Sequence, residues 1–265
     1  MPGLNGYIKM IKNCIIYKYS DEFRNAWEMD TNKLSKNTLK KCLQEAQGFS
    51  KKKIEALMEL TKNERISFKE ETQSHYIATF SCEFRVPKFI ATGVSPPFVP
   101  VNFNIWLRKK SSWVISLDAG RKLSGVAITL LSHSTIGNPS SIKPIRLEKE
   151  DFLSLKDWLL AESHIISGQI KRITMHNIVK DSEKFKQIVL NSSRLETSKL
   201  FYRLLSSASA IANLSFTTPV LKSTSRSLSC RINHWGCVTI YTPDLLDSEL
   251  SELIEIFEML YTHST

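Results

Sequence analysis

Three side chains that can bind a soft metal ion lie close together near the end of the chain. Cys230, His234 and Cys237 have the spacing Cys-x3-His-x2-Cys. Thiolate and imidazole groups are the usual protein ligands of zinc, and a fourth ligand would have to come from another segment. We favour the alternative that both cysteines are strand residues facing the core and that His234 belongs to a turn. We therefore expect no metal and no cofactor.

Other segments offer little that resembles a catalytic site. The segment Gly120-Arg-Lys-Leu-Ser-Gly125 has two glycines at the spacing of a phosphate-binding loop, but no Lys-Ser or Lys-Thr follows the second glycine. We interpret it as a basic β-turn between two strands. Asp118 with His133, and Asp181 with His176, have the residue types for acid–base catalysis, but nothing in the sequence brings either pair together. We expect a protein that is not an enzyme.

Cations and aromatic side chains are concentrated on one predicted β-meander. Bases of single-stranded nucleic acid stack on aromatic rings for about 1 to 3 kcal/mol each, while Lys and Arg neutralise the phosphates. Burial in the core is the competing interpretation of each tryptophan in this segment. The charge on the turns favours a nucleic-acid-binding site, which we expect to contain Trp106, Arg108, Lys109, Lys110, Trp113, Arg121 and Lys122.

A second basic cluster lies nearer the N-terminus. Lys51, Lys52 and Lys53 fall in the first turn of a predicted helix, where the helix dipole disfavours cations by roughly a few tenths of a kcal/mol each. Their presence there indicates that the helix holds an anion, and a phosphate group would fit. The alternative is that these three lysines are simply solvated on an exposed turn.

The elements that must position these residues are both helices and strands. Apolar residues at helical spacing predict helices over 35–47, 51–62, 150–160, 182–212 and 247–261. Alternating β-branched and aromatic residues predict strands over 7–19, 76–86, 101–109, 113–118, 125–132, 142–147, 169–175, 216–222, 227–233 and 236–241.

This order predicts an α+β fold of antiparallel β-meanders, each followed by a packing helix, after a small N-terminal helical region. We divide the chain into a basic helical region (1–70), a meander-plus-helix unit (71–165) and a second α+β unit (166–265). The segments Gly125-Val-Ala-Ile-Thr and Gly236-Cys-Val-Thr-Ile each precede an amphipathic helix, which indicates two similar halves. An internal duplication and two unrelated units both remain open.

The charge balance favours a polyanionic partner. The chain of 265 residues has 36 Lys and Arg against 26 Asp and Glu, a net charge of +10. Residues 244–258 hold six acids and no Lys or Arg, so the rest of the chain carries +16. Such a charge attracts nucleic acid or an anionic membrane surface, and salt weakens the attraction. A basic surface without a specific partner is the alternative.

The acids of residues 244–258 are placed mainly on a predicted C-terminal helix. Its apolar residues, such as Leu250 and Phe257, form one stripe, and Glu249, Glu252 and Glu255 fall largely around the other side. We expect the helix to close the core with a solvated acidic back. The alternative is that the acids cover the basic face and compete with phosphate for the same lysines.

Composition also bears on the compartment. Five scattered cysteines without a Cys-x-x-Cys motif suit a reducing environment. Apolar runs are shorter than a membrane-spanning segment needs, and the first residues do not resemble a secretory signal. We therefore expect an intracellular protein, in the cytoplasm or the nucleus.

Residues 100–162 resemble a known type of fold. The order of strands from Phe103 to Leu147, with the ending Pro144-Ile-Arg-Leu-Glu-Lys-Glu-Asp-Phe-Leu-Ser-Leu-Lys-Asp-Trp158, is similar to the meander and helix of the positive-cofactor-four type of transcriptional coactivator. It resembles the Whirly family more distantly. Those families bind single-stranded nucleic acid on their sheet. The resemblance implies that Lys109, Lys110, Arg121 and Lys122 contact nucleic acid.

These observations give one leading hypothesis and one alternative. The leading hypothesis is a non-catalytic protein that binds single-stranded DNA or RNA through a basic, aromatic-bearing sheet face and that forms a homo-oligomer. The alternative is a peripheral scaffold, like a viral matrix protein, whose basic face meets anionic lipid at about 1 kcal/mol per cation. In that case Pro96-Pro-Phe98 would dock a protein partner.

Overall fold

The structure, a computed structural model, describes residues 12–29, 61–85, 98–138, 140–180 and 183–261. These residues fall into two units, which are treated one at a time. The first unit is Cys14–Pro144, and the second contains the residues from Ile145 onward with Lys12 and Asn13. The boundaries expected at 70/71 and 165/166 differ from this division, since residues 70 and 71 lie inside a single strand.

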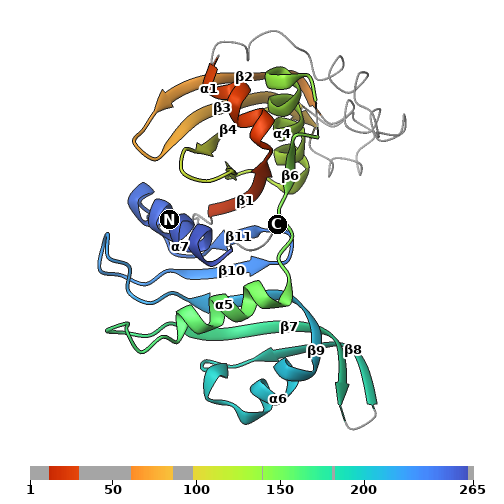
Figure 1. Cartoon of the computed structure of the whole chain (residues 1–265), viewed down its shortest axis with the longest axis vertical. Helices are drawn as coiled ribbons and strands as arrows, with labels where there is room; N and C mark the ends of the chain where they lie inside the picture. Colours follow the sequence, from red (N-terminus) through yellow and green to blue (C-terminus); the bar gives the residue numbers. More distant parts are fainter. Residues whose placement is uncertain (1–11, 30–60, 86–97, 139, 181–182, 262–265) are drawn as a thin grey trace, which may run out of the picture. The chain divides into compact units, whose positions relative to one another are not determined.

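In its described residues, the first unit is an antiparallel sheet with two helices (Figure 1). Its strands, in the order β2-β3-β4-β5-β1 with β6 paired to β1, are β1 (Lys12–Tyr19), β2 (Thr61–Glu71), β3 (His75–Arg85), β4 (Phe98–Arg108), β5 (Trp113–Leu117) and β6 (Ile142–Pro144). Its helices are α1 (Asp21–Met29) and α4 (Arg121–Ile136). The sequence therefore predicted β3, β4 and β5 correctly to within a few residues.

The strand predicted over 125–132 is wrong, because these residues lie inside α4. An apolar run of this kind suits a buried strand and a buried helix alike. Here the helix continues for 16 residues and ends at Gly137, whose φ of 71° is a left-handed cap conformation that glycine adopts easily. Within the helix, the Thr129 hydroxyl donates a hydrogen bond of 2.8 Å to the carbonyl of Gly125.

Two further expectations change with this helix. The segment from Gly120 to Gly125 is the cap and first turn of α4 and not a turn between strands. The comparison that indicated two similar halves also fails, because the segment beginning at Gly125 is helical whereas residues 237–240 form a strand.

The second unit is another antiparallel sheet with three α-helices in its described residues (Figure 1). Its strands, in the order β11-β10-β9-β7-β8, are β7 (Gln169–Lys180), β8 (Glu183–Asn191), β9 (Ala208–Thr217), β10 (Ser229–Asn233) and β11 (Cys237–Ile240). Its helices are α5 (Lys149–Leu159), α6 (Lys199–Ser207) and α7 (Asp247–Leu260), with a short 3-10 turn, η3 (Leu195–Thr197).

The long helix predicted over 182–212 is wrong. Residues 183–191 form β8, residues 208–217 form β9, and a short helix, α6, lies between them. The β-branched Ile188 and Val189 favour the extended state, and the sheet pairing of β8 with β7 overrides the helical spacing of the apolar residues. Sequence reasoning was right for α5, α7, β10 and β11.

The predicted helices 35–47 and 51–60 lie outside the described residues, and Thr61 and Lys62 already belong to β2. As a whole, the described residues form an α+β fold in which both units contain antiparallel sheet. Among the helices of the described segments, none is long and apolar enough to cross a membrane.

Helix α7 corrects one expectation about the acidic residues. Its stripe of Leu250, Leu253, Ile254 and Phe257 is buried, as expected for a helix that closes a core. Glu249, which we placed on the solvated side, is also fully buried. Its carboxylate forms an ion pair with Arg226, which lies in the loop before β10. This pairing offsets much of the free-energy cost of burying a charged group.

Candidate nucleic-acid interface

The tryptophans of the predicted binding site are core residues. Trp106 is 3% exposed and Trp113 is 6% exposed. The Trp106 ring stacks on His75 with a centroid separation of 4.2 Å. A base cannot reach either ring without unfolding the first unit, so the expected stacking on Trp106 and Trp113 is wrong. Their burial follows from their positions on β4 and at the start of β5, strands whose neighbours cover them.

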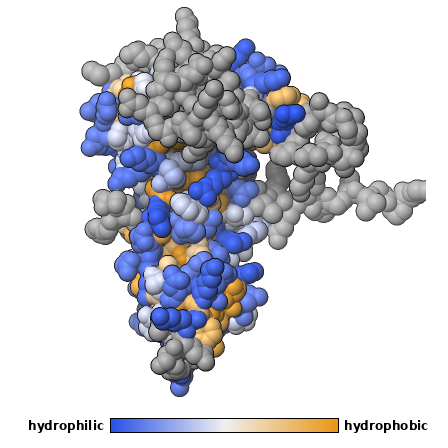
Figure 2. Space-filling model, turned by 90° about the vertical axis from the view of Figure 1, so that its right-hand side faces the viewer, coloured by the Kyte–Doolittle hydropathy of each residue, from blue (hydrophilic) through white to orange (hydrophobic). Residues whose placement is uncertain are grey.

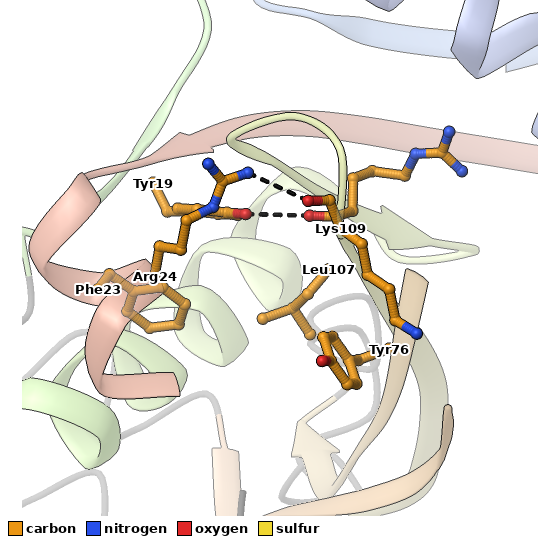
Figure 3. A pocket seen from close by; sticks show the side chains of 7 residues that line it. Tyr19, Phe23, Arg24, Tyr76, Leu107 and Lys109 are labelled. Atoms are coloured by element: carbon orange, nitrogen blue, oxygen red, sulfur yellow. Dashed lines mark hydrogen bonds between the residues drawn. The ribbon is translucent and has the colours of Figure 1, made fainter. Parts of the chain in front are cut away.

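Arg108 and Lys109 are also occupied by the fold. Arg108 is 2% exposed, and its carbonyl accepts a hydrogen bond of 2.9 Å from the hydroxyl of Tyr19. Lys109 donates to the carboxylate of Glu71 at 2.7 Å, and its ammonium lies 4.8 Å from the centre of the Tyr76 ring. Arg24 donates to the Lys109 carbonyl at 3.2 Å, as Figure 3 shows.

The hollow between these side chains is small. It is lined by Tyr19, Phe23, Arg24, Tyr76, Leu107, Arg108 and Lys109, and its volume of about 10 Å³ is the space of roughly one water molecule. These cations therefore fix the loop after β4 and do not form an open anion site. Burial explains why Arg108 does not serve as the surface cation that we expected.

The remaining predicted cations are exposed but differently placed. Lys110 lies in the loop after β4, and Arg121 and Lys122 lie in the first turn of α4. Lys51, Lys52 and Lys53 lie outside the described residues. The structure therefore does not bring the predicted residues together on one sheet face.

The metal ligands suggested by spacing are also separated in the sheet. Cys230 on β10 is buried and lies opposite Ile240, as expected for a core strand residue. Cys237 is half-buried, and the backbone N–H of His234 donates to the carbonyl of Ala212. Across the described segments, no group of three or more His, Cys, Asp or Glu side chains is arranged to hold a metal ion.

The sheet of the second unit has two chemically different faces. Residues directly opposite one another on antiparallel strands point to the same face. One such row runs across all five strands and is apolar: Leu190, Ile173, Leu214, Ile232 and Val238. Helix α5 packs on β9 and on α7, and Figure 1 shows α5 lying across the sheet. This side of the sheet forms the core of the unit.

The neighbouring row on the opposite face is polar and basic. We call it the arginine row; it contains Asn191 on β8, Arg172 on β7, Ser215 on β9, Arg231 on β10 and Thr239 on β11. Arg172 and Arg231 are exposed, and Ser215 lies between them. Since adjacent strands are about 4.8 Å apart, the two arginine Cα atoms are roughly 10 Å apart.

The arginine row contains no carboxylate. Within the described residues neither Arg172 nor Arg231 forms an ion pair. The next row contains Val189, Thr174, Asn213 and Asn233. In that row the Thr174 hydroxyl donates to the side-chain oxygen of Asn213 at 3.3 Å. The face thus presents guanidinium, amide and hydroxyl groups side by side.

Partly exposed aromatic residues lie at two borders of this sheet. Trp235, in the β10–β11 turn, is half-buried, and the guanidinium of Arg146 lies 5.7 Å from its ring centre. The side-chain oxygen of Asn233 fixes the turn by accepting the N–H of Trp235 at 2.9 Å. On β8, at the other border, Phe185 is 38% exposed between two exposed lysines.

The space-filling view shows how the surface of this region is mixed. Strands β7 and β8 and helix α6 lie at the lower end of Figure 1. There, hydrophobic residues reach the surface among hydrophilic ones (Figure 2). Exposed apolar side chains in these elements include Phe185, Val189, Leu200 and Tyr202.

Sequence reasoning missed Arg172 and Arg231, although the signal was present. Arg231 lies between Cys230 and Ile232, which are both buried, and the segment was predicted as a strand. A cation between two core residues of a strand points to the outer face. The predicted site was built on charges in turns, whereas these two charges project from the interiors of strands.

Comparison with known proteins adds no family. Neither the models of protein families nor the curated proteins contain a match to this chain. The resemblance of residues 100–162 to the positive-cofactor-four and Whirly type of fold therefore stays a prediction.

Proposed function

We propose that this protein is a non-catalytic nucleic-acid-binding protein that binds single strands on the arginine row. The observation that carries the proposal is the placement of Arg172 and Arg231 on either side of Ser215, in a row without a carboxylate. Guanidinium groups bind phosphate through paired hydrogen bonds. The net charge of +10 adds long-range attraction.

Three properties of the face favour single strands over a lipid surface. Asn191 offers an exposed amide, and Asn213 and Asn233, whose side-chain oxygens accept hydrogen bonds within the fold, offer side-chain N–H groups that can donate to base edges. Trp235 and Phe185 are exposed enough to stack on a base. A lipid headgroup uses the cations but has no use for the amides. The flat strand surface is also how several RNA-binding sheets present their contacts.

The test is oligonucleotide binding by two matched double variants. Arg172→Ala with Arg231→Ala removes two charges from the face, and Lys110→Ala with Lys122→Ala removes two exposed charges from the first unit. Binding of a short fluorescent single-stranded oligonucleotide is followed by anisotropy across a salt series. We expect the arginine variant to bind about tenfold or more weakly and to flatten the salt slope by about 1.4, while the lysine variant changes little.

Three outcomes would reject the proposal. They are no binding at low salt, equal losses in the two variants, and binding to anionic vesicles without binding to oligonucleotide. The last result would favour the membrane scaffold, so vesicles with and without phosphatidylserine are measured in parallel. The expected homo-oligomer is a separate prediction, which analytical ultracentrifugation of the full chain tests.

A further inference from the structure

A groove of about 670 Å³ lies on the helical side of the second unit. It runs between α7 and the loop from Pro219 to Ser223, and Trp158 and His164 contribute to its wall. Ligand sites usually have volumes of about 300 to 1,000 Å³. The groove is therefore large enough for several side chains of a bound molecule.

One face of α7 forms the long wall of the groove. Ser248, Glu252, Glu255 and Met259 follow the helical spacing along this wall. Met259 follows Ser248 by eleven positions, which is a rise of about 16 Å along the helix. The buried stripe of α7 faces the core instead, so the wall is a second face of the same helix. An opening of this length accommodates about three turns of another helix.

The lining is largely apolar although solvent reaches it. Trp158, Val220 and Ile256 are half-buried, and Met259 is 61% exposed. Ile165 and Ile166, which directly follow His164 in the chain, are 100% and 59% exposed. Isolated exposed apolar residues are common on protein surfaces, but a hollow lined by them together with exposed isoleucines beside it indicates a binding surface.

The α7 wall of the groove is acidic, whereas the facing loop carries one exposed cation, Lys222. Glu252 is fixed there because it accepts the backbone N–H groups of Lys222 and Ser223, each at 2.8 Å. Glu255 lies one turn further along α7 and is exposed. The segment 244–258 that supplies this wall carries six acids and no Lys or Arg. Along the α7 wall, charge complementarity therefore favours basic side chains on a partner.

We propose that this groove binds a short amphipathic helix of a partner protein, with its apolar side chains in the groove and its Lys or Arg side chains beside Glu252 and Glu255. This is the helix-in-groove mode, in which apolar residues at helical spacing anchor the peptide. The inference does not depend on the arginine row, which lies on the opposite face of the same sheet. Nucleic acid and the partner helix can therefore be bound together.

The test uses two synthetic peptides and the full chain. One peptide places leucines on one helical face and lysines beside them; the other replaces every lysine with glutamate. Each is fluorescently labelled, and binding is measured by anisotropy. We expect the lysine peptide to bind at least tenfold more tightly than the glutamate peptide.

Two variants locate the binding. Glu255→Lys reverses an exposed rim charge, and Met259→Ser removes an exposed apolar contact, so neither should disturb folding. Glu22→Lys, an exposed acid of α1 in the first unit, is the matched charge control. Both groove variants should weaken the lysine peptide about tenfold, and the control should not.

Failure of the lysine peptide to bind, or equal binding of the two peptides, would overturn the inference. So would unchanged binding of the lysine peptide in both groove variants. Loss of oligonucleotide binding alone would reject the proposed function and leave the groove standing, because the two measurements use different surfaces.

Discussion

Arg226 and Glu249 form a two-point ion pair that joins a loop to the start of α7. The Nε and Nη2 atoms of the arginine donate to the two carboxylate oxygens, with Nη2 2.6 Å from Oε2. Thr224 donates to Oε1 at 2.6 Å, and the backbone N–H of Leu246 donates to Oε2 at 2.9 Å. The buried carboxylate is thus fully hydrogen-bonded, and the loop that lines the groove is held against the helix.

Glu249→Gln should destabilise the protein markedly. The glutamine keeps the size of the side chain but loses the charge and part of the hydrogen bonding. Breaking a buried ion pair usually costs about 3 to 5 kcal/mol, and we expect about 3, because the Arg226 side chain, 37% exposed, can turn to water. Urea unfolding measures the change. The exposed Asp247→Asn variant should lose less than about 1 kcal/mol, and equal losses would contradict this account.

The same carboxylate makes stability depend on acid. The hydrogen bond from Arg226, helped by those of Thr224 and Leu246 and opposed by burial, lowers the pKa of Glu249 from 4.5 to about 2. A depressed folded-state pKa stabilises the protein above the unfolded-state value, and the stabilisation is lost as the pH falls from about 4.5 towards 2. The stability gap between the native protein and Glu249→Gln should therefore narrow over this range. A constant gap between pH 6 and pH 3 would refute the assignment.

Two glycines offer a test of the elements around them. A Cβ on Gly168 would lie 2.7 Å from the carbonyl oxygen of Thr217 and 2.8 Å from the Cδ2 of Leu159. Gly168→Ala should therefore destabilise by about 1 to 3 kcal/mol. Gly125 lies inside α4 with nothing within 4 Å of such a Cβ. Gly125→Ala should stabilise by about 0.5 to 1 kcal/mol, since alanine favours helices. Thermal unfolding of both variants should show shifts of opposite sign.

Some elements of the fold could be predicted from the sequence and others could not. Periodicity located α5 and α7, because each helix has one apolar face and one polar face, and it located most strands of both units. It failed at 125–132, where both helix and strand would be buried, and at 183–191, where an apolar helical pattern belongs to a sheet edge. At 183–191 the antiparallel pairing with β7 decided the outcome. The prediction of which cations are exposed also failed, since Arg108 is buried by strands that are remote in sequence.

Substitution of two tryptophans should separate effects on stability from effects on oligonucleotide binding. Trp106→Ala removes a buried ring that stacks on His75, so we expect a loss of about 3 to 5 kcal/mol in stability. Trp235→Ala, at the half-buried turn, should cost less stability but weaken oligonucleotide binding about tenfold, because one stacked base is worth about 1 to 3 kcal/mol. Unfolding and anisotropy are measured on both variants. A Trp106→Ala protein that stays folded and loses affinity for oligonucleotide would indicate that the binding site lies in the first unit instead.

The acidic residues of α7 should not inhibit nucleic-acid binding. They project from a helix on the core side of the sheet, whereas the arginine row lies on the other face. At physiological salt, charges separated by more than about 8 Å are largely screened. Asp247→Asn with Glu255→Gln, both exposed, should therefore change oligonucleotide affinity by less than about threefold at that salt.

Deleting Leu246–Thr265 removes Leu253 and Phe257 from the core and should yield an unfolded or aggregated protein. If α7 were autoinhibitory, the truncated protein would stay folded, and the charge variant would bind oligonucleotide more tightly. Circular dichroism of the truncation and anisotropy of the charge variant decide between the two accounts.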